Sequence, residues 1–98
     1  MSCTFAVESW TVHLSGEIDY AASLALAPQL DELTRSCAGD LLFDLEGVTL
    51  MDSEGVKLLL ASRAKMRNKQ GAARVVRCSK SVHRVLCLTG LHDLLEMG

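Results

Sequence analysis

The stretch from Phe43 to Leu60 constrains the fold more than any other part of the chain. Its sequence, FDLEGVTLMDSEGVKLLL, begins with a largely apolar run and ends with apolar residues at helical spacing. This change of pattern predicts a buried strand, a short turn and an amphipathic helix. Ser53 then lies at the start of that helix, where backbone N–H groups lack partners and the helix dipole is positive. Such a serine is either a helix cap or a site of covalent chemistry.

The rest of the chain alternates between strand patterns and helix patterns. The predicted elements are strands 5–7 and 10–14, helix 21–36, strand 41–45, a helix from Ser53 to about Gly71, strand 73–78, a helix capped by Ser79 or Ser81 that ends at Gly90, and a last short strand over 91–97. A hairpin through Glu8 and Ser9 joins the first two strands, and Gly16 ends the second. The order β-β-α-β-α-β-α-(β) predicts an α/β fold with a mixed four- to five-stranded sheet and helices packed on it.

Length and composition predict a single cytoplasmic domain that spans residues 1–98. A chain of 98 residues has room for one hydrophobic core, and an apolar fraction of 49% excludes wholesale disorder. No segment has the ~18 apolar residues of a membrane span, and the first residues lack the basic and apolar regions of a secretory signal. The four cysteines show no metal-ligand spacing, so we expect reduced thiols and no metal site: Cys3, Cys37, Cys78 and Cys87.

Charge is distributed unevenly along the sequence. Residues 1–54 hold ten of the twelve acidic residues, whereas residues 57–84 hold nine of the ten basic ones. This pattern predicts either an acidic and a basic sector on the surface, one of them facing a charged partner, or simply solvated helix faces. Nucleic acid is a poor candidate partner, because the net charge is −2 and no aromatic residues are interleaved among the bases.

A serine at a strand-to-helix turn also occurs in the nucleophile elbow of hydrolases, G-x-S-x-G. Gly55 fits that pattern, but Met51 stands where the first glycine belongs. The histidines available as a base are His13, His83 and His92, and a spatial pairing with Ser53 stays open at this point. The sequence contains no phosphate-binding loop. We therefore expect a non-enzymatic protein without a cofactor, which can receive a phosphoryl group but cannot transfer one.

Three segments together resemble STAS domains, above all the bacterial anti-sigma factor antagonists. The turn Asp52-Ser53-Glu54-Gly55 is similar to the family's D-[ST]-x-G, in which the serine or threonine is phosphorylated. The segment LSGEID over 14–19 is similar to the family's L-x-G-E-[LI]-D, and VHRVLCLTGLHDLL over 82–95 resembles its third helix and following turn. The resemblance covers nearly the whole chain, with the segments in the same order.

The resemblance implies a switch between binding partners. In this family the unphosphorylated antagonist binds an anti-sigma factor that is also a serine kinase, and the sigma factor is released. The kinase uses Mg-ATP to phosphorylate the turn serine, which ends the binding, and a metal-dependent serine phosphatase restores it. Carried over by position, Ser53 is the phosphoacceptor, Asp19 and Asp52 flank the partner-binding surface, and Gly55 lets the partner approach the start of the helix.

Each of these residues also has a purely structural interpretation. Asp19 and Asp52 can cap helices, and Gly55 can serve close packing between helix and sheet. Glu54 replaces the small residue that often follows the phosphoacceptor, so a carboxylate already lies beside Ser53. Lys57 is a weaker candidate for partner contact, since it also fits the solvated face of its helix.

Two other functions within the family stay open. They are a non-catalytic subunit that docks on the ATPase of a lipid ABC transporter, and a scaffold of stress-signalling assemblies. The chain ends at Gly98, soon after the family's G-L turn, where many antagonists continue into a further strand and helix. We therefore expect a bare sheet edge or helix face that can support a homodimer.

Overall fold

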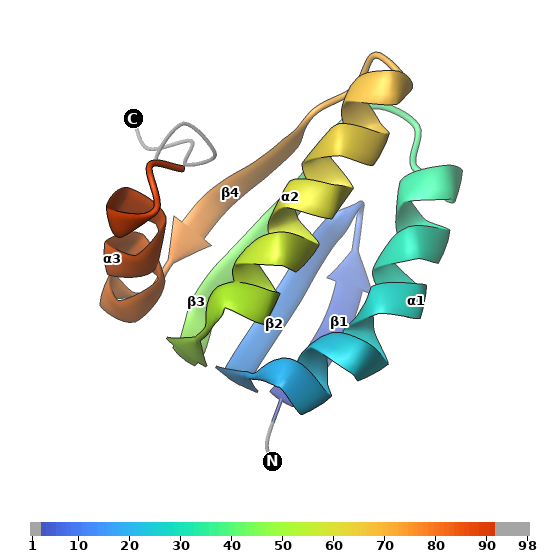
Figure 1. Cartoon of the computed structure of the whole chain (residues 1–98). Helices are drawn as coiled ribbons and strands as arrows, with labels where there is room; N and C mark the ends of the chain where they lie inside the picture. Colours follow the sequence, from blue (N-terminus) through green and yellow to red (C-terminus); the bar gives the residue numbers. More distant parts are fainter. Residues whose placement is uncertain (1–2, 92–98) are drawn as a thin grey trace.

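The computed structural model describes residues 3–91 as one mixed sheet with three helices (Figure 1). The strands lie in the order β1-β2-β3-β4, with β1 antiparallel to β2 and the other neighbours parallel. In chain order the elements are β1 (Cys3–Glu8), β2 (Thr11–Ile18), α1 (Tyr20–Ser36), β3 (Leu41–Met51), α2 (Ser53–Asn68), β4 (Ala73–Cys78) and α3 (Lys80–Leu88). The predicted order β-β-α-β-α-β-α is confirmed, and the predicted last strand, except its first residue, lies outside the described residues.

The helices pack on one face of the sheet. Crossovers between parallel strands are right-handed, so two successive crossovers in the same direction place their helices on the same side. Figure 1 shows α1 and α2 side by side over that face, both beginning at the same end of the sheet. The third helix, α3, packs against β3 and β4 and contributes Val82 and Leu86 to the same core.

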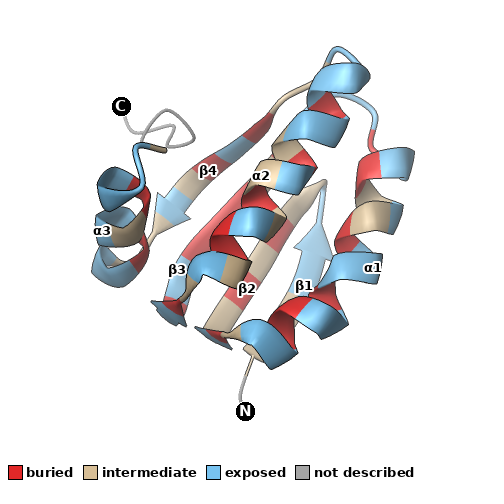
Figure 2. Cartoon of the chain, in the orientation of Figure 1, coloured by how far each residue is buried: buried red, intermediate tan, exposed pale blue. Residues whose placement is uncertain are grey.

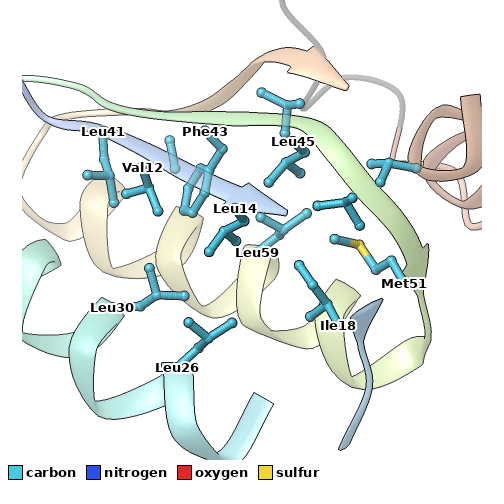
Figure 3. Close-up of a cluster of buried hydrophobic side chains, with 14 of the residues drawn as sticks. Val12, Leu14, Ile18, Leu26, Leu30, Leu41, Phe43, Leu45, Met51 and Leu59 are labelled. Atoms are coloured by element: carbon cyan, nitrogen blue, oxygen red, sulfur yellow. The ribbon is translucent and has the colours of Figure 1, made fainter. Parts of the chain in front are cut away.

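Strand and helix periodicities meet in one hydrophobic core (Figure 3). Every second residue of a strand points toward the helices, and the helices return residues at spacings of three and four. Figure 2 shows these buried positions as stripes on the inner side of α1 and α2. The labelled core residues in Figure 3 are Val12, Leu14 and Ile18 from β2, Leu26 and Leu30 from α1, Leu41, Phe43, Leu45 and Met51 from β3, and Leu59 from α2.

The first hairpin differs from its prediction by one residue. Ser9 and Trp10 form the turn, both with positive φ (52° and 61°), and Glu8 pairs with Thr11. Two residues of positive φ give a turn whose twist matches that of the flanking strands, which explains why it forms here without glycine. The prediction of a turn at Glu8 and Ser9, and of Trp10 within a strand, was therefore wrong.

The extension of β2 and β3 beyond their predicted ends builds the site. Gly16 does not end β2: at φ 92° it lies beside a shift in the pairing of β2 with β3, and the strand continues to Ile18. The third strand continues past Leu45 to Met51 and pairs it with Ile18. A side chain at Gly47 would put its Cβ 2.6 Å from the Ser15 Cβ, so only glycine lets the two strands stay paired there. The extended strands bring the starts of α1 and α2 together.

The opposite face of the sheet carries a polar cluster that the sequence did not predict. Asp44 is buried on that face, where Oδ2 lies 3.1 Å from His13 Nδ1 and accepts a hydrogen bond from Arg77 Nη2 at 2.9 Å. Its Oδ1 accepts from the backbone N–H of Glu46 at 3.1 Å. A hollow of about 220 Å³ lies next to this cluster and is lined by Thr4, Ala6, His13, Leu14, Ser15, Asp44, Glu46 and Gly47.

The Asp44 cluster predicts a pH dependence of folding stability. Burial raises the pKa of the Asp44 carboxyl. The hydrogen bond from the Glu46 backbone N–H, the positive charge of Arg77, and the side-chain hydrogen bonds with His13 and Arg77 outweigh burial and hold this pKa below its ordinary value. A carboxyl with a lowered folded-state pKa stabilises the fold above its unfolded pKa, and this stability is lost as the pH falls through the folded-state pKa. We therefore expect Asp44→Asn to lose less stability than the wild type between about pH 5 and pH 3.

Urea unfolding at a series of pH values measures this difference. Asp40→Asn is the matched control, because Asp40 lies just before β3 and is more exposed than Asp44. Parallel stability curves for the wild type and Asp44→Asn would contradict the role assigned to the cluster.

Candidate functional site

The candidate site lies at the two turns that connect β2 to α1 and β3 to α2. These two strands are parallel neighbours, so their carboxyl ends meet at the same edge of the sheet. The Asp52 N–H donates to the Ile18 carbonyl at 3.3 Å, which places Asp19 and Asp52 next to each other. The structure thus brings together two segments, 14–19 and 52–55, that are far apart in sequence.

Both aspartates are helix caps. Asp19 has extended backbone geometry, and its Oδ1 accepts from the Ala22 N–H at 2.9 Å at the start of α1. Asp52 does the same for α2, accepting from the N–H groups of Glu54 at 2.9 Å and Gly55 at 3.3 Å. Aspartate is among the best residues for this role, because its carboxylate satisfies N–H groups that have no partner within the helix.

Because Asp52 caps α2, Ser53 does not act as the cap. It is the first residue of α2 and is exposed. Within residues 3–91, no hydrogen bond joins the Ser53 hydroxyl to another side chain or to the backbone. The choice left open by the sequence, Ser53 or Asp52 as the cap, is decided in favour of Asp52. The hydroxyl is therefore free to meet another molecule at the positive end of a helix dipole.

The residues that follow Ser53 comprise an outer ion pair and one buried glycine. Glu54 is half-buried and accepts a hydrogen bond from Lys57 Nζ at 3.0 Å, while Lys57 itself is exposed. Gly55 is buried, and a Cβ at this position would lie 2.7 Å from Met51 Cγ and 3.1 Å from Ile18 Cγ2. The geometry gives Gly55 a packing role between α2 and the sheet, and its contact with a partner stays a prediction.

Replacing the cap tests the division of roles between Asp52 and Ser53. We expect Asp52→Ala to lower the stability by about 1 kcal/mol, because it removes two hydrogen bonds at the start of α2. For a domain of this size the Tm falls by about 4–8 °C per kcal/mol. Thermal unfolding followed by circular dichroism measures the change. Asp52→Asn is the matched control, since asparagine caps equally well without the charge, and an equal Tm loss in both variants would argue against capping.

The hydrolase alternative finds no support in the described residues. His13 lies on β2 and contacts Asp44 on the opposite face of the sheet. His83 lies on α3, where its ring is near the Cys87 thiol. Neither forms a hydrogen bond with Ser53, so residues 3–91 contain no serine–histidine pair at this turn. His92 lies outside the described residues.

No metal centre is present among the described residues either. Within residues 3–91, no group of three or more histidine, cysteine, aspartate or glutamate side chains could hold a metal ion. None of the helices in that part of the chain is long and apolar enough to cross a bilayer.

Part of the uneven charge of the sequence is balanced by ion pairs between the two halves of the chain. Acidic residues of the first half form ion pairs with basic residues of the second half, across α1 and α2 and across β3 and β4. These pairs are Asp31–Lys65, Asp40–Arg74, Asp44–Arg77 and Glu46–Arg77. At these positions the predicted acidic and basic sectors are not separated. Glu54 pairs with Lys57 within α2, whereas Asp19 and Asp52, the other acidic residues near Ser53, form no ion pair within residues 3–91.

Comparison with known proteins decides the family. The sequence model of the STAS domain matches residues 7–98, which is nearly the whole chain. The chain belongs to the STAS domain family. This STAS domain is 31% identical over 87 residues to an anti-sigma F factor antagonist of Paenibacillus polymyxa, across 88% of this chain and 74% of that protein. The predicted resemblance is confirmed.

Solved structures agree with this assignment. The crystal structure of an anti-sigma factor antagonist from Mycobacterium paratuberculosis matches this STAS domain with a TM-score of 0.80 at 27% identity, covering 97% of this chain and 82% of that one. The anti-sigma factor antagonist SpoIIAA in its unphosphorylated form matches with a TM-score of 0.79 at 21% identity, over 96% and 85% of the two chains. The second match bears on the fold alone, and it confirms the mixed sheet with helices.

Proposed function

We propose that this STAS domain is an anti-sigma factor antagonist of the cytoplasm that is switched at Ser53. Its unphosphorylated form binds an anti-sigma factor with serine kinase activity, and the sigma factor is released. The kinase uses Mg-ATP to phosphorylate Ser53 and thereby ends the binding, and a metal-dependent serine phosphatase restores it. The chain itself is a binding protein without catalytic activity.

The free hydroxyl of Ser53 is the observation that carries this proposal. A phosphoacceptor must reach the active site of a kinase, and Ser53 is exposed at the start of α2. Its hydroxyl is not needed for the fold, because Asp52 already satisfies the N–H groups of Glu54 and Gly55. A phosphoryl group can therefore be added without breaking a hydrogen bond among the described residues.

The charge around Ser53 explains how one phosphoryl group can end binding. Phosphorylation adds about 1.5–2 negative charges and three acceptor oxygens. A helix N-terminus tolerates an anion, so the domain stays folded. The new charge adds to Asp19, Asp52 and Glu54 at a surface that a partner must desolvate. A loss of about 3 kcal/mol in binding free energy lowers the affinity more than a hundredfold.

Glu54 is compatible with this switch although the family often has a small residue there. Its carboxylate accepts a hydrogen bond from Lys57 Nζ at 3.0 Å, and Lys57 lies one helical turn after Ser53. An exposed pair of this kind contributes little to stability, but it holds the Lys57 charge beside the Glu54 carboxylate. Lys57 thus supports kinase access to Ser53 by holding Glu54.

An affinity capture tests the proposal. Wild type, Ser53→Ala and Ser53→Asp are used side by side as bait in lysate of the native cell, and the bound proteins are identified by mass spectrometry. We expect the wild type and Ser53→Ala to retain a serine-kinase anti-sigma factor and Ser53→Asp to lose it.

The other family functions give different results in the same experiment. Recovery of an ABC ATPase by all three baits would replace the antagonist with a transporter subunit and leave Ser53 without a switching role. Recovery of a large assembly of STAS proteins would point to a stress-signalling scaffold.

A further inference from the structure

The described surface contains one pair of neighbouring exposed apolar side chains, and it lies beside Ser53. Tyr20 and Leu24 are each 60% exposed and are one turn apart on α1, so they share one face of that helix. The other large apolar residues exposed within residues 3–91 lie on other elements: Val7, Leu50 and Leu88. Single exposed apolar residues are ordinary, whereas adjacent ones mark a contact surface.

Contacts between α1 and α2 fix where this pair lies. Lys65 on α2 pairs with Asp31 on α1, 34 positions earlier. Lys69 Nζ donates to the carbonyls of Thr34 at 2.8 Å and Arg35 at 3.0 Å, which lie 35 and 34 positions earlier, so the offset stays close to 34. The two helices lie side by side and begin at the same end of the sheet (Figure 1), so this offset extends to their first turns. It places Tyr20 level with Glu54 and Leu24 level with Leu58.

The pair also faces the α2 side of α1. Asp31, which reaches across to Lys65, lies two helical turns after Leu24 and therefore on the same stripe of α1. Tyr20 and Leu24 thus lie along the contact between the two helices, next to the turn that carries Ser53. Leu58, which is half-buried, adds apolar surface on the α2 side of this contact.

The size of protein interfaces connects this surface to Ser53. A stable interface covers about 800 Å² on each partner, which corresponds to a disc of about 16 Å radius. The axes of packed helices are only about 8–10 Å apart. A partner that covers Ser53 must therefore also cover the first turns of α1. Tyrosine is enriched among the residues that dominate binding energy, because it buries a large area and retains a polar end.

We propose that Tyr20 and Leu24 form an apolar anchor for the anti-sigma factor kinase, next to the Ser53 switch. This inference rests on the proposed function and names the second part of the same docking surface. Because Asp19, Asp52 and Glu54 surround Ser53, the matching surface of the kinase carries basic residues beside an apolar socket. The anchor supplies affinity through apolar contact, and a phosphoryl group on Ser53 prevents the kinase from binding there.

The test measures the affinity of the purified kinase for matched variants by calorimetric titration. The kinase is the anti-sigma factor recovered by the capture experiment. The double variant Tyr20→Ala/Leu24→Ala removes the anchor. Leu88→Ala removes an even more exposed leucine from α3, which lies on the opposite side of the molecule (Figure 1). Alanine keeps both helices intact. We expect the double variant to bind at least tenfold more weakly and Leu88→Ala to bind within twofold of the wild type.

The controls separate this inference from the proposed function. Thermal unfolding shows whether the double variant folds, and the single variant Tyr20→Phe retains wild-type binding if apolar contact is the cause. Unchanged kinase affinity of the double variant, with Ser53→Asp still inactive, overturns the anchor and leaves the switch standing. If the double variant instead changes only the self-association of the chain in size-exclusion chromatography, the surface belongs to a second copy and the anchor is wrong. Capture of no kinase by the wild type overturns both proposals.

Discussion

Ser53→Ala should abolish phosphoryl transfer from the cognate anti-sigma factor kinase to this chain. The substitution removes the exposed hydroxyl at the start of α2 and leaves the Asp52 cap in place. Because alanine is a good helix former and the serine side chain makes no hydrogen bond within residues 3–91, the folded state is unaffected. Incubation with the kinase and Mg-ATP, followed by mass spectrometry of the intact protein, measures the transfer directly.

Ser81→Ala is a matched control for this experiment. Ser81 is also an exposed serine in the first turn of a helix, and Ser79 caps that helix as Asp52 caps α2. We expect Ser81→Ala to accept one phosphoryl group as the wild type does. Transfer that persists in Ser53→Ala and disappears in Ser81→Ala would move the switch from α2 to α3 and refute the proposed phosphoacceptor.

Gly55→Val should lower stability by about 2–3 kcal/mol, because the new side chain overpacks a tight contact. The Cβ alone would lie 2.7 Å from Met51 Cγ and 3.1 Å from Ile18 Cγ2, and both of these residues are buried. To relieve the contact, the first turn of α2 must move away from the sheet and carry Ser53 with it. Stability and kinase binding are therefore lost together. Urea unfolding gives the first effect and calorimetric titration with the kinase gives the second.

Glu54→Val provides the comparison for Gly55→Val. It places the same side chain one residue earlier, at a half-buried position that does not point between α2 and the sheet. We expect its stability to stay within about 0.5–1 kcal/mol of the wild type. If Gly55→Val lowers the stability as little as Glu54→Val does, the space between α2 and the sheet can accommodate a valine side chain. The packing role of Gly55 is then wrong, and its role in partner contact is favoured.

The fold could be predicted from the sequence wherever the apolar period was uninterrupted. Strand 73–78 and the start of the helix at Ser53 agree with the structure, because each is bounded by a clear change of pattern. The ends of β2 and β3 could not be predicted in this way. Glycines at positions 16 and 47 suggest turns in a single sequence, but both serve the pairing of these strands, through a register shift and a close approach. That pairing depends on residues some thirty positions apart.

The candidate site was predictable in its residues but not in its division of roles. The sequence predicted the turn at 52–55 and the acidic residue at 19 as parts of the site. Their proximity follows from the parallel pairing of β2 and β3. That Asp52 rather than Ser53 caps α2 depends on backbone geometry at one residue. The Asp44 cluster was missed, although a charged residue inside the apolar run 41–45 was the available signal. The exposure of Tyr20 and Leu24 depends on which face of α1 meets the sheet.

The division of roles between Asp52 and Ser53 has a consequence for signalling in time. Since the cap is independent of the hydroxyl, the proposed phosphorylation of Ser53 leaves the fold in place, and we expect neither chemical state to be a preferred target for proteases that remove unfolded chains. The same molecule could then be phosphorylated and dephosphorylated many times before it is degraded. In the proposed switch, the fraction of unphosphorylated protein in the cell would follow the ratio of phosphatase to kinase activity, and recovery after a signal would require no new synthesis of the protein.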